Sequence, residues 1–190
     1  MRELTLIRHG LTEGVEKRWY YGGTDLPLTA AGRARLAEQK AAGIYPDAAG
    51  KRLITTNMCR AQETAALLYP GHPAEIIPEL REVSFGEFEC KSYEDLKDTE
   101  AFQDWLAGDW YRVAPPGGES YAQSEARILG AMKAIFACEE DTVIVAHGGT
   151  IIVTMEFLFP EEHKTQPEWC PEAGCGWQVD LQAHTYRKIG

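Results

Sequence analysis

Two histidines follow two predicted buried strands at equivalent positions. His9 comes after the apolar run Leu4–Ile7, separated from it by Arg8, and His147 directly follows the apolar run 142–146. In parallel α/β sheets, ligands bind beyond the carboxyl ends of the strands. Each histidine is followed by glycine, which lets the backbone turn sharply and approach a ligand closely. We therefore expect the two imidazoles to face one another across a cleft.

Two arginines are expected at the same edge of the sheet. Arg8 precedes His9, and Arg60 lies in the first turn of a helix that follows the predicted strand 52–56. A guanidinium is planar and permanently charged, and it binds phosphate oxygens through paired hydrogen bonds. A helix that begins at Gly148 or the next residue would add unpaired N–H groups and a partial positive charge. Together these groups predict a phosphate-binding pocket.

The rest of the chain predicts the sheet that brings these residues together. Apolar, β-rich runs alternate with helical periodicity, which is typical of an α/β fold with crossover helices. Thr29 is a suitable N-cap and Gly43 a suitable stop for one helix. We expect strands at 4–7, 52–56, 74–77 and 142–146, two weaker strands within 174–186, and helices at about 29–43, 59–69, 93–106, 120–138 and from 148 onward. The lack of an internal repeat or linker favours one domain, residues 1–190.

The bulk composition argues against several classes of function. The 190 residues carry a net charge of −10, and an acidic protein without a concentrated basic patch is a poor partner for nucleic acid. No apolar run reaches the length of a membrane span, and the N-terminus lacks a signal-peptide pattern. We therefore expect a cytoplasmic protein with no membrane partner.

The cysteines are predicted to be reduced. There are five, an odd number, and they are widely scattered. Cys170 and Cys175 form the only close pair, with His163 and His184 as the nearest further zinc ligands, and this spacing is not typical of a metal site. We expect free thiols near a surface loop.

The first histidine lies in a segment that resembles a family signature. Residues 6–12, Leu-Ile-Arg-His-Gly-Leu-Thr, look like the R-H-G-x-T motif of the histidine phosphatase superfamily, the phosphoglycerate mutase-like enzymes. Other segments resemble further motifs in the family's order: 22–32 (G-x-T-D-x-P-L-T-x-x-G), 60–65 (R-A-x-x-T-A), 80–90 (L-x-E-x-x-F-G-x-W-E-G), 116–120 (P-G-G-E-S) and 145–149 (the late H-G-G motif). R-H-G alone is a weak signal, whereas the ordered set is specific.

The resemblance implies a three-layer α/β/α sandwich with a mostly parallel central sheet, and a role for each residue of the pocket. His9 would be the nucleophile that becomes phosphohistidine. Arg8, Arg60 and His147 would hold the phosphoryl oxygens and stabilise the transition state. Glu82 would protonate the leaving oxygen and then activate water. No metal and no cofactor is implied.

The implied chemistry makes physical demands on these side chains. A histidine nucleophile must be neutral, although the unperturbed pKa is about 6.5. Arg8 and Arg60 would favour the neutral form of His9 through like-charge repulsion. Glu82 must carry a proton to act as an acid, which a bound phosphate dianion favours. Covalent catalysis divides one hard displacement into two easier ones, with fixed positive donors providing the largest stabilisation.

Substrate contacts are expected from backbone and side-chain groups of Arg8, Thr12, Gly22, Arg60, His147 and Gly148. Val15 stands where many family members carry an Asn that helps to bind phosphate. Thr12, a backbone N–H near Gly22 or water would have to replace that donor. Phe88 and Cys90 replace the Trp and Gly of the F-G-x-W-E-G motif, and we interpret them as a reshaped substrate wall.

Several nearby residues have a second interpretation. Most loop carboxylates are only solvated, so a glutamate in this stretch is not an acid by default. The motif selects Glu82 as the acid, and Glu89 is the alternative. Ser120 or Glu119 is expected to satisfy the N-terminus of the helix after the Pro-Gly-Gly turn. The tryptophans are expected to pack, with one or two at the substrate mouth: Trp19, Trp105, Trp110, Trp169 and Trp177.

We expect hydrolysis of a small phosphorylated metabolite. Phosphoglycerate mutases of the family use the same pocket but carry a basic insert, whereas the segment 91–116 is short and acidic. The length and the P-G-G-E-S segment look like the α-ribazole phosphatase branch, which makes α-ribazole 5′-phosphate a candidate substrate.

Two other classes and one assembly question stay open. A metal hydrolase could use His9, His147 and Glu82 as ligands, although the arginines beside them oppose a cation. A non-catalytic phosphate-binding module is opposed by the presence of every proposed catalytic residue. A homodimer is left open.

Overall fold

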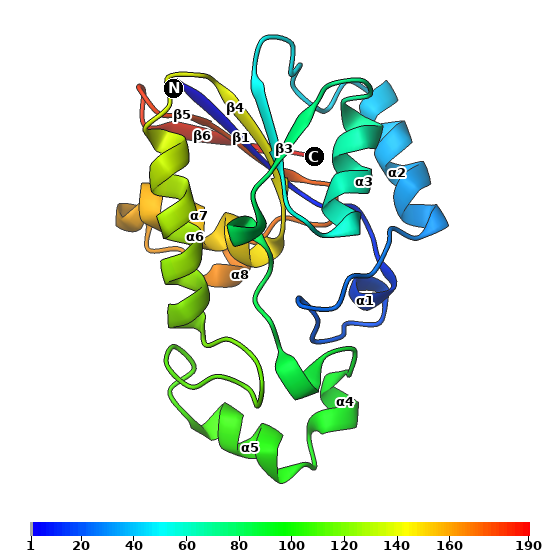
Figure 1. Cartoon of the computed structure of the whole chain (residues 1–190), viewed down its shortest axis with the longest axis vertical. Coiled ribbons are helices and arrows are strands. Elements are labelled where there is room, and N and C mark those ends of the chain that lie inside the picture. The colour runs from blue at the N-terminus through cyan, green and yellow to red at the C-terminus, as the bar shows by residue number, and fades with distance from the viewer. Residues whose placement is uncertain (1) are drawn as a thin grey trace.

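A six-stranded sheet forms the centre of the computed structural model, which describes residues 2–190 (Figure 1). The strand order is β3-β2-β4-β1-β5-β6. The strands are β1 (Glu3–Arg8), β2 (Arg52–Thr55), β3 (Ala74–Ile76), β4 (Thr142–Ala146), β5 (Gly176–Asp180) and β6 (Thr185–Ile189). The first four are parallel, and β5 and β6 pair antiparallel. The predicted, mostly parallel sheet is confirmed; the first residue of the predicted domain, Met1, lies outside the described residues.

Helices cover both faces of the sheet (Figure 1). On one side lie α2 (Ala30–Ala41) and α3 (Cys59–Leu68); on the other lie α6 (Tyr121–Phe136), α7 (Gly148–Leu158) and the short α8 (Gln166–Trp169). Successive side chains of β1 pack on opposite faces of the sheet and belong to two separate core clusters. Leu6 packs with Ile128 of α6 and Ile151 of α7. Ile7 points the other way and packs with Leu36 of α2. This period of two is that of a strand buried on both faces.

The central strands β1 and β4 bring the two histidines together. Both strands are almost entirely buried, and Arg8 lies opposite Ala146 in their parallel register. The ladder continues one step further, since the backbone N–H of His9 donates to the carbonyl of Ala146 over 2.9 Å. His9 and His147 are thus the first residues beyond two adjacent strand ends, as the sequence predicts.

Helix boundaries follow capping chemistry. Thr29 caps α2, with its hydroxyl accepting from the N–H of Gly32 over 3.0 Å, and Gly43 has a φ of +70° just beyond the helix. Ser120 caps α6 in a capping box with Gln123. The structure also contains short elements that the sequence does not predict, because they are too short to show a period. They are α1 (Glu13–Glu16) and the 3₁₀ turns η1 (Pro78–Leu80), η2 (Gly86–Phe88) and η3 (Pro160–Glu162).

A small helical segment projects away from the sheet. It contains α4 (Tyr93–Leu96) and α5 (Glu100–Ala107), at the bottom of Figure 1. Phe88, Leu96 and Phe102 form its own buried cluster, with Phe85 and Trp105 packed against it. No helix within residues 2–190 combines the length and apolarity needed to cross a bilayer.

Candidate active site

The imidazoles of His9 and His147 lie side by side beyond the sheet. Their ring centroids are 5.4 Å apart, and the planes are inclined by 59°. His9 is 2% exposed and His147 is fully buried. Burial and the positive charges of Arg60 and Arg8 lower the pKa of His9 well below its ordinary value. Both causes keep the ring neutral, which a nucleophile requires.

The tautomer of His9 follows from its backbone contact. Nδ1 of His9 lies 2.7 Å from the carbonyl oxygen of Gly10. A carbonyl can only accept, so Nδ1 carries the hydrogen and donates it. The neutral ring therefore presents the lone pair of Nε2. The N–H of Gly10 in turn donates to the hydroxyl of Thr64 over 3.0 Å, which fixes this turn.

His147 is held by Thr56, a residue that the sequence analysis placed only at a strand end. Nε2 of His147 lies 2.9 Å from the Thr56 hydroxyl oxygen. Burial and the charge of Arg60 lower the pKa of His147 well below its ordinary value. Nδ1 of His147 is buried and has no hydrogen-bond partner within residues 2–190. If the hydroxyl donates to Nε2, then Nδ1–H is free to donate to a ligand.

The two arginines are anchored through some of their nitrogens only. Arg60 is fully buried, and its terminal nitrogens donate to the carbonyls of Thr24 and Gly22, each over 2.9 Å. Arg8 donates from Nη1 to the carbonyl of Pro171 over 2.9 Å and contacts the Cys170 thiol. The Nε atoms of both arginines are buried and unpartnered among the described residues.

The loop that holds Arg60 is itself held by Glu89. The carboxylate accepts from the backbone N–H groups of Gly22, Gly23, Thr24 and Phe85, at 2.8 to 3.1 Å. Burial alone would raise the pKa of Glu89, but these four N–H groups outweigh it and lower the pKa. The carboxylate is thus a fixed anion and a structural support, which argues against Glu89 as the acid.

Glu82 lies beside the start of α7. Its carboxylate accepts from the N–H of Gly149 over 3.1 Å and from the N–H of Val83 over 3.0 Å. Glu82 and Gly148 both line the same cavity as His9, Arg8 and Arg60. The structure therefore brings the predicted acid to the predicted nucleophile.

Thr12 and Gly22 are not on the cavity wall. The Thr12 hydroxyl lies 2.6 Å from that of Tyr21, which does line the cavity, and it also caps α1. The N–H of Gly22 is taken by Glu89, and a Cβ at Gly22 would lie 1.8 Å from the carbonyl oxygen of Val83. Gly22 is thus required for close approach of two loops. Val15 also lies outside the wall.

The cavity above the histidines has a volume of about 440 Å³. Its wall is largely aromatic and apolar: Trp19, Tyr21, Phe85, Trp105, Trp110, Val113, Pro115, Tyr121 and Ile152. Three tryptophans line the cavity, whereas the sequence predicts one or two at the substrate mouth. Phe88 and Cys90 do not form part of it, so their interpretation as a substrate wall is wrong; Phe88 is buried in the small helical segment.

The cysteines and the Pro-Gly-Gly turn also differ from expectation. None of the five cysteines forms a disulfide within residues 2–190, but Cys175 is buried and Cys170 lines the cavity, so this pair is not on a surface loop. Ser120 caps α6 as expected, whereas Glu119 binds Arg81 and Arg127. Within residues 2–190, no group of three His, Cys, Asp or Glu side chains is placed to hold a metal ion.

Comparisons with known proteins agree with this geometry. The sequence model of the Histidine phosphatase superfamily (branch 1) matches residues 4–177. The chain is 28% identical to the adenosylcobalamin/alpha-ribazole phosphatase of Salmonella typhimurium, over 94% of this chain and 90% of that one. It is 33% identical to the 2,3-bisphosphoglycerate-dependent phosphoglycerate mutase of Xanthobacter autotrophicus, over 84% of each chain.

A solved structure shares the fold. The crystal structure of a putative alpha-ribazole-5′-P phosphatase from Escherichia coli superposes with a TM-score of 0.81 at 24% identity, over 98% of this chain and 94% of that one. The fold, the ordered motifs and the family match together lead to one conclusion: the chain belongs to the histidine phosphatase superfamily.

Proposed function

We propose that this protein hydrolyses a small phosphomonoester through a phosphohistidine formed on Nε2 of His9. One observation carries the proposal. Three buried donors have no partner within residues 2–190, Nε of Arg8, Nε of Arg60 and Nδ1 of His147, and all three belong to side chains beside His9. A buried donor without a partner is costly, and a phosphoryl group would supply the acceptors.

The reaction divides into two displacements at phosphorus. In the first, the Nε2 lone pair of His9 forms the N–P bond while the P–O bond to the leaving group breaks. Glu82 gives its proton to the leaving oxygen. In the second, water attacks phosphorus, Glu82 takes a proton from the water, and the electrons of the N–P bond return to Nε2. Arg8, Arg60 and His147 stabilise the charge on the phosphoryl oxygens in both steps.

The ring of His9 becomes cationic when it carries the phosphoryl group, because Nδ1 keeps its hydrogen. The carbonyl of Gly10 accepts that hydrogen at 2.7 Å and stabilises the positive ring. The same contact orients Nε2 before reaction. Positioning and charge stabilisation thus come from groups already in place.

The cavity wall supports a substrate with one phosphate and an apolar, planar leaving group. Arg8 and Arg60 are the only Arg or Lys side chains on the wall among the described residues, and Glu82 and Glu119 add negative charge. A second anionic group on the substrate would meet no cation beyond the phosphate site. Aromatic walls instead favour stacking with a flat group. We propose α-ribazole 5′-phosphate as the specific candidate, since relatives carry that name.

Phosphoglycerate mutase is the second candidate, supported by the relative that carries this name. Its substrate has a carboxylate beside the phosphate, and the aromatic wall offers it no further cation. The discriminating assay compares 3-phosphoglycerate with an aryl phosphate. Hydrolysis of the aryl phosphate without interconversion of phosphoglycerates supports the phosphatase; the reverse supports the mutase. Full activity in the presence of a chelator would eliminate the metal hydrolase.

The decisive experiment traps the covalent intermediate. The protein is mixed with an aryl phosphate carrying labelled phosphorus and quenched in acid or in alkali. We expect a phosphoenzyme that is acid-labile and alkali-stable and that His9→Ala abolishes. His184→Ala, at an exposed histidine paired with Glu161, is the matched control and should still be labelled. Phosphate binding without any labelling or turnover would identify a non-catalytic module instead.

A further inference from the structure

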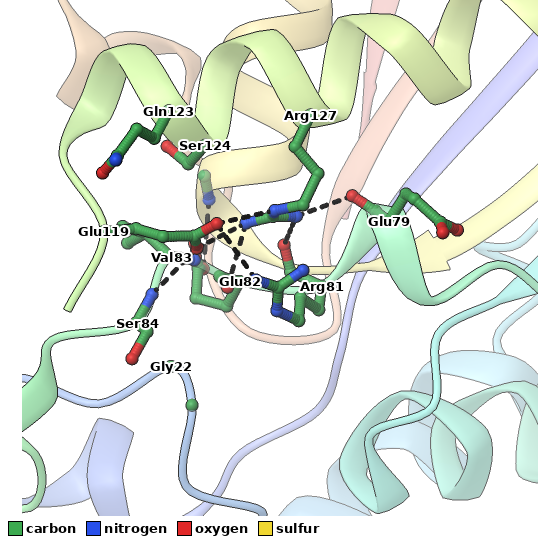
Figure 2. A network of polar contacts seen from close by, with 12 residues as sticks. Gly22, Glu79, Arg81, Glu82, Val83, Ser84, Glu119, Gln123, Ser124 and Arg127 are labelled. Atoms are coloured by element: carbon green, nitrogen blue, oxygen red, sulfur yellow. Dashed lines mark hydrogen bonds and ion pairs between the residues drawn. The ribbon is translucent and has the colours of Figure 1, made fainter. Parts of the chain in front are cut away.

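A charged network holds the backbone on which Glu82 lies (Figure 2). Arg127, on α6, uses all five N–H donors of its guanidinium. Nε and Nη2 donate to the two carboxylate oxygens of Glu119 over 2.9 and 2.7 Å. Nη1 donates to the carbonyls of Glu79 and Arg81 over 2.6 and 3.0 Å, and Nη2 also reaches the carbonyl of Glu82 over 3.5 Å.

Glu119 is the second centre of this network. Besides Arg127, its carboxylate accepts from the guanidinium of Arg81 over 3.0 Å and from the backbone N–H of Ser84 over 3.4 Å. Burial alone would raise the pKa of Glu119, but Arg127 and Arg81 outweigh it and lower the pKa. The carboxylate is therefore anionic at neutral pH. Figure 2 shows Arg127 reaching from α6 to Glu119 and to the backbone of the segment 79–84.

The segment 79–84 depends on these contacts because no strand ladder holds it. It contains the end of η1 and then runs as irregular chain. On the α7 side it is tied by the Thr150 hydroxyl, which donates to the carbonyl of Leu80 over 2.7 Å, and by the N–H of Gly149 on the Glu82 carboxylate. On the α6 side, Arg127 binds three of its backbone carbonyls, those of Glu79, Arg81 and Glu82.

We infer that Arg127 and Glu119 are positioning residues that hold the Glu82 carboxyl within reach of the leaving oxygen. The inference rests on the proposed function, in which Glu82 is the acid. Arg127 lies outside the cavity wall, so it acts through the backbone of 79–84 and not on the substrate. The planar fork suits this task, since a lysine offers one nitrogen and cannot span Glu119 and three carbonyls.

The leaving group distinguishes positioning of the acid from general structural support. Expulsion of para-nitrophenolate needs little protonation, whereas expulsion of benzyl alkoxide depends on it. Arg127→Lys keeps the charge but loses the fork. We expect it to lower kcat/KM for benzyl phosphate by about 10- to 100-fold, less than the 10²- to 10⁴-fold that a general acid typically contributes, and for para-nitrophenyl phosphate by less than about threefold. Arg52→Lys is the matched control. Arg52 begins β2, at the amino end of the strand and away from the cavity, and pairs with Glu75, so this change should leave kcat/KM for both substrates unaltered.

A double-mutant comparison completes the test. In the Glu82→Gln background, Arg127→Lys should cause no further loss on benzyl phosphate, because the acid that it positions is gone. Arg127→Lys should leave the inhibition constant of orthophosphate unchanged, because Arg127 lies outside the cavity wall. Should Arg127→Lys fold poorly, as judged by circular dichroism, Glu119→Gln serves as the second variant and is judged by the ratio of its losses on the two substrates. Equal losses on the two substrates, or additive loss in the double mutant, would overturn the inference. If Glu82→Gln itself lowers kcat/KM equally for both substrates, Glu82 is not the acid, and the inference about Arg127 is overturned with that assignment.

Discussion

The hydroxyl oxygen of Thr56 lies 2.9 Å from Nε2 of His147, and both side chains are buried at the end of neighbouring strands. The only other hydrogen bond to this hydroxyl within residues 2–190 comes from the backbone N–H of Met58, which leaves its proton for the imidazole. With this hydroxyl as the donor, Nε2 accepts, and the hydrogen of the neutral His147 ring lies on Nδ1, where it can donate to a phosphoryl oxygen.

Thr56→Val should therefore lower kcat/KM, and it should also cost about 1–3 kcal/mol in the free energy of unfolding because it leaves Nε2 of His147 buried without its partner. The change keeps the shape but leaves the His147 tautomer unset, and we expect about a tenfold loss, below the 10²- to 10³-fold loss typical of removing a donor outright. Thr56→Ser should retain activity. Thr5→Val removes an equally buried hydroxyl that has no partner within residues 2–190 and is the matched control. Wild-type kcat/KM in Thr56→Val would show that the hydroxyl does not set the tautomer.

Glu89→Gln should weaken both folding and activity. Gln presents an NH₂ group to backbone donors that now point at a carboxylate, so we expect a loss of about 1–2 kcal/mol in the free energy of unfolding. Activity should also fall, because the loop that Glu89 holds supplies the carbonyls that anchor Arg60. Glu87→Gln, at an exposed neighbour, is the control.

The effect of Glu89→Gln should depend on pH. The folded-state pKa of Glu89 is lowered, so the unfolded chain takes up its proton first as the pH falls. The stabilisation is therefore complete above an unfolded pKa of about 4.3 and is lost below it, as the pH falls through the folded pKa. Urea unfolding at several pH values would measure this. If the difference in the free energy of unfolding between wild type and Glu89→Gln stayed constant as the pH falls into acid, the pKa of Glu89 would not be lowered in the fold.

The two buried histidines should make the protein less stable in mild acid. Each has a folded-state pKa well below that of the unfolded chain, so below about pH 6.5 the unfolded state binds the extra proton. Stability then falls by about 1.4 kcal/mol per pH unit for each such histidine. His9→Gln should remove about one such contribution, as measured by urea unfolding from pH 7 to pH 5. His184→Gln, at an exposed site, should leave the slope unchanged; an equal slope in His9→Gln and wild type would mean that His9 is protonated in the fold.

Cys90→Gly should stabilise the protein. Cys90 has a φ of +58°, in the left-handed region that favours glycine, and it occupies the position where the family motif has Gly. Relief of this strain, offset by the greater freedom of glycine in the unfolded chain, should raise the free energy of unfolding by up to about 1 kcal/mol. Cys90→Ala, which removes the thiol without freeing φ, should bring no such gain. Equal urea midpoints for the two variants would exclude backbone strain at this position.

The sequence predicts most of the sheet and the chemical core of the site. The strands around Leu6 and Val145 are apolar on both faces, which is typical of central parallel strands, and the strand-end histidines follow from them. The position of β4 between β1 and β2 is not visible in local patterns, because strand order depends on packing across the whole fold. It is this adjacency that places His147 beside His9.

The supporting contacts are the part that the sequence does not reveal. Arg127 has the spacing of an ordinary helix surface residue, and its role arises from carbonyls of an irregular segment more than forty positions earlier. The motif predicts that Ser120 or Glu119 satisfies the N-terminus of α6; Ser120 does so, and Glu119 instead binds Arg127. Such side-chain networks depend on tertiary geometry and leave no periodic signal.

The position of the phosphoryl group on the trapped enzyme shows which ring nitrogen is the nucleophile. Phosphorus–nitrogen couplings, measured by NMR on the phosphoenzyme with labelled histidine, identify the bonded ring nitrogen. Because Nδ1 of His9 donates to the carbonyl of Gly10, we predict phosphorus bonded to Nε2 of His9 alone. Phosphorus on Nδ1 of His9, on His147 or on no histidine at all would contradict it.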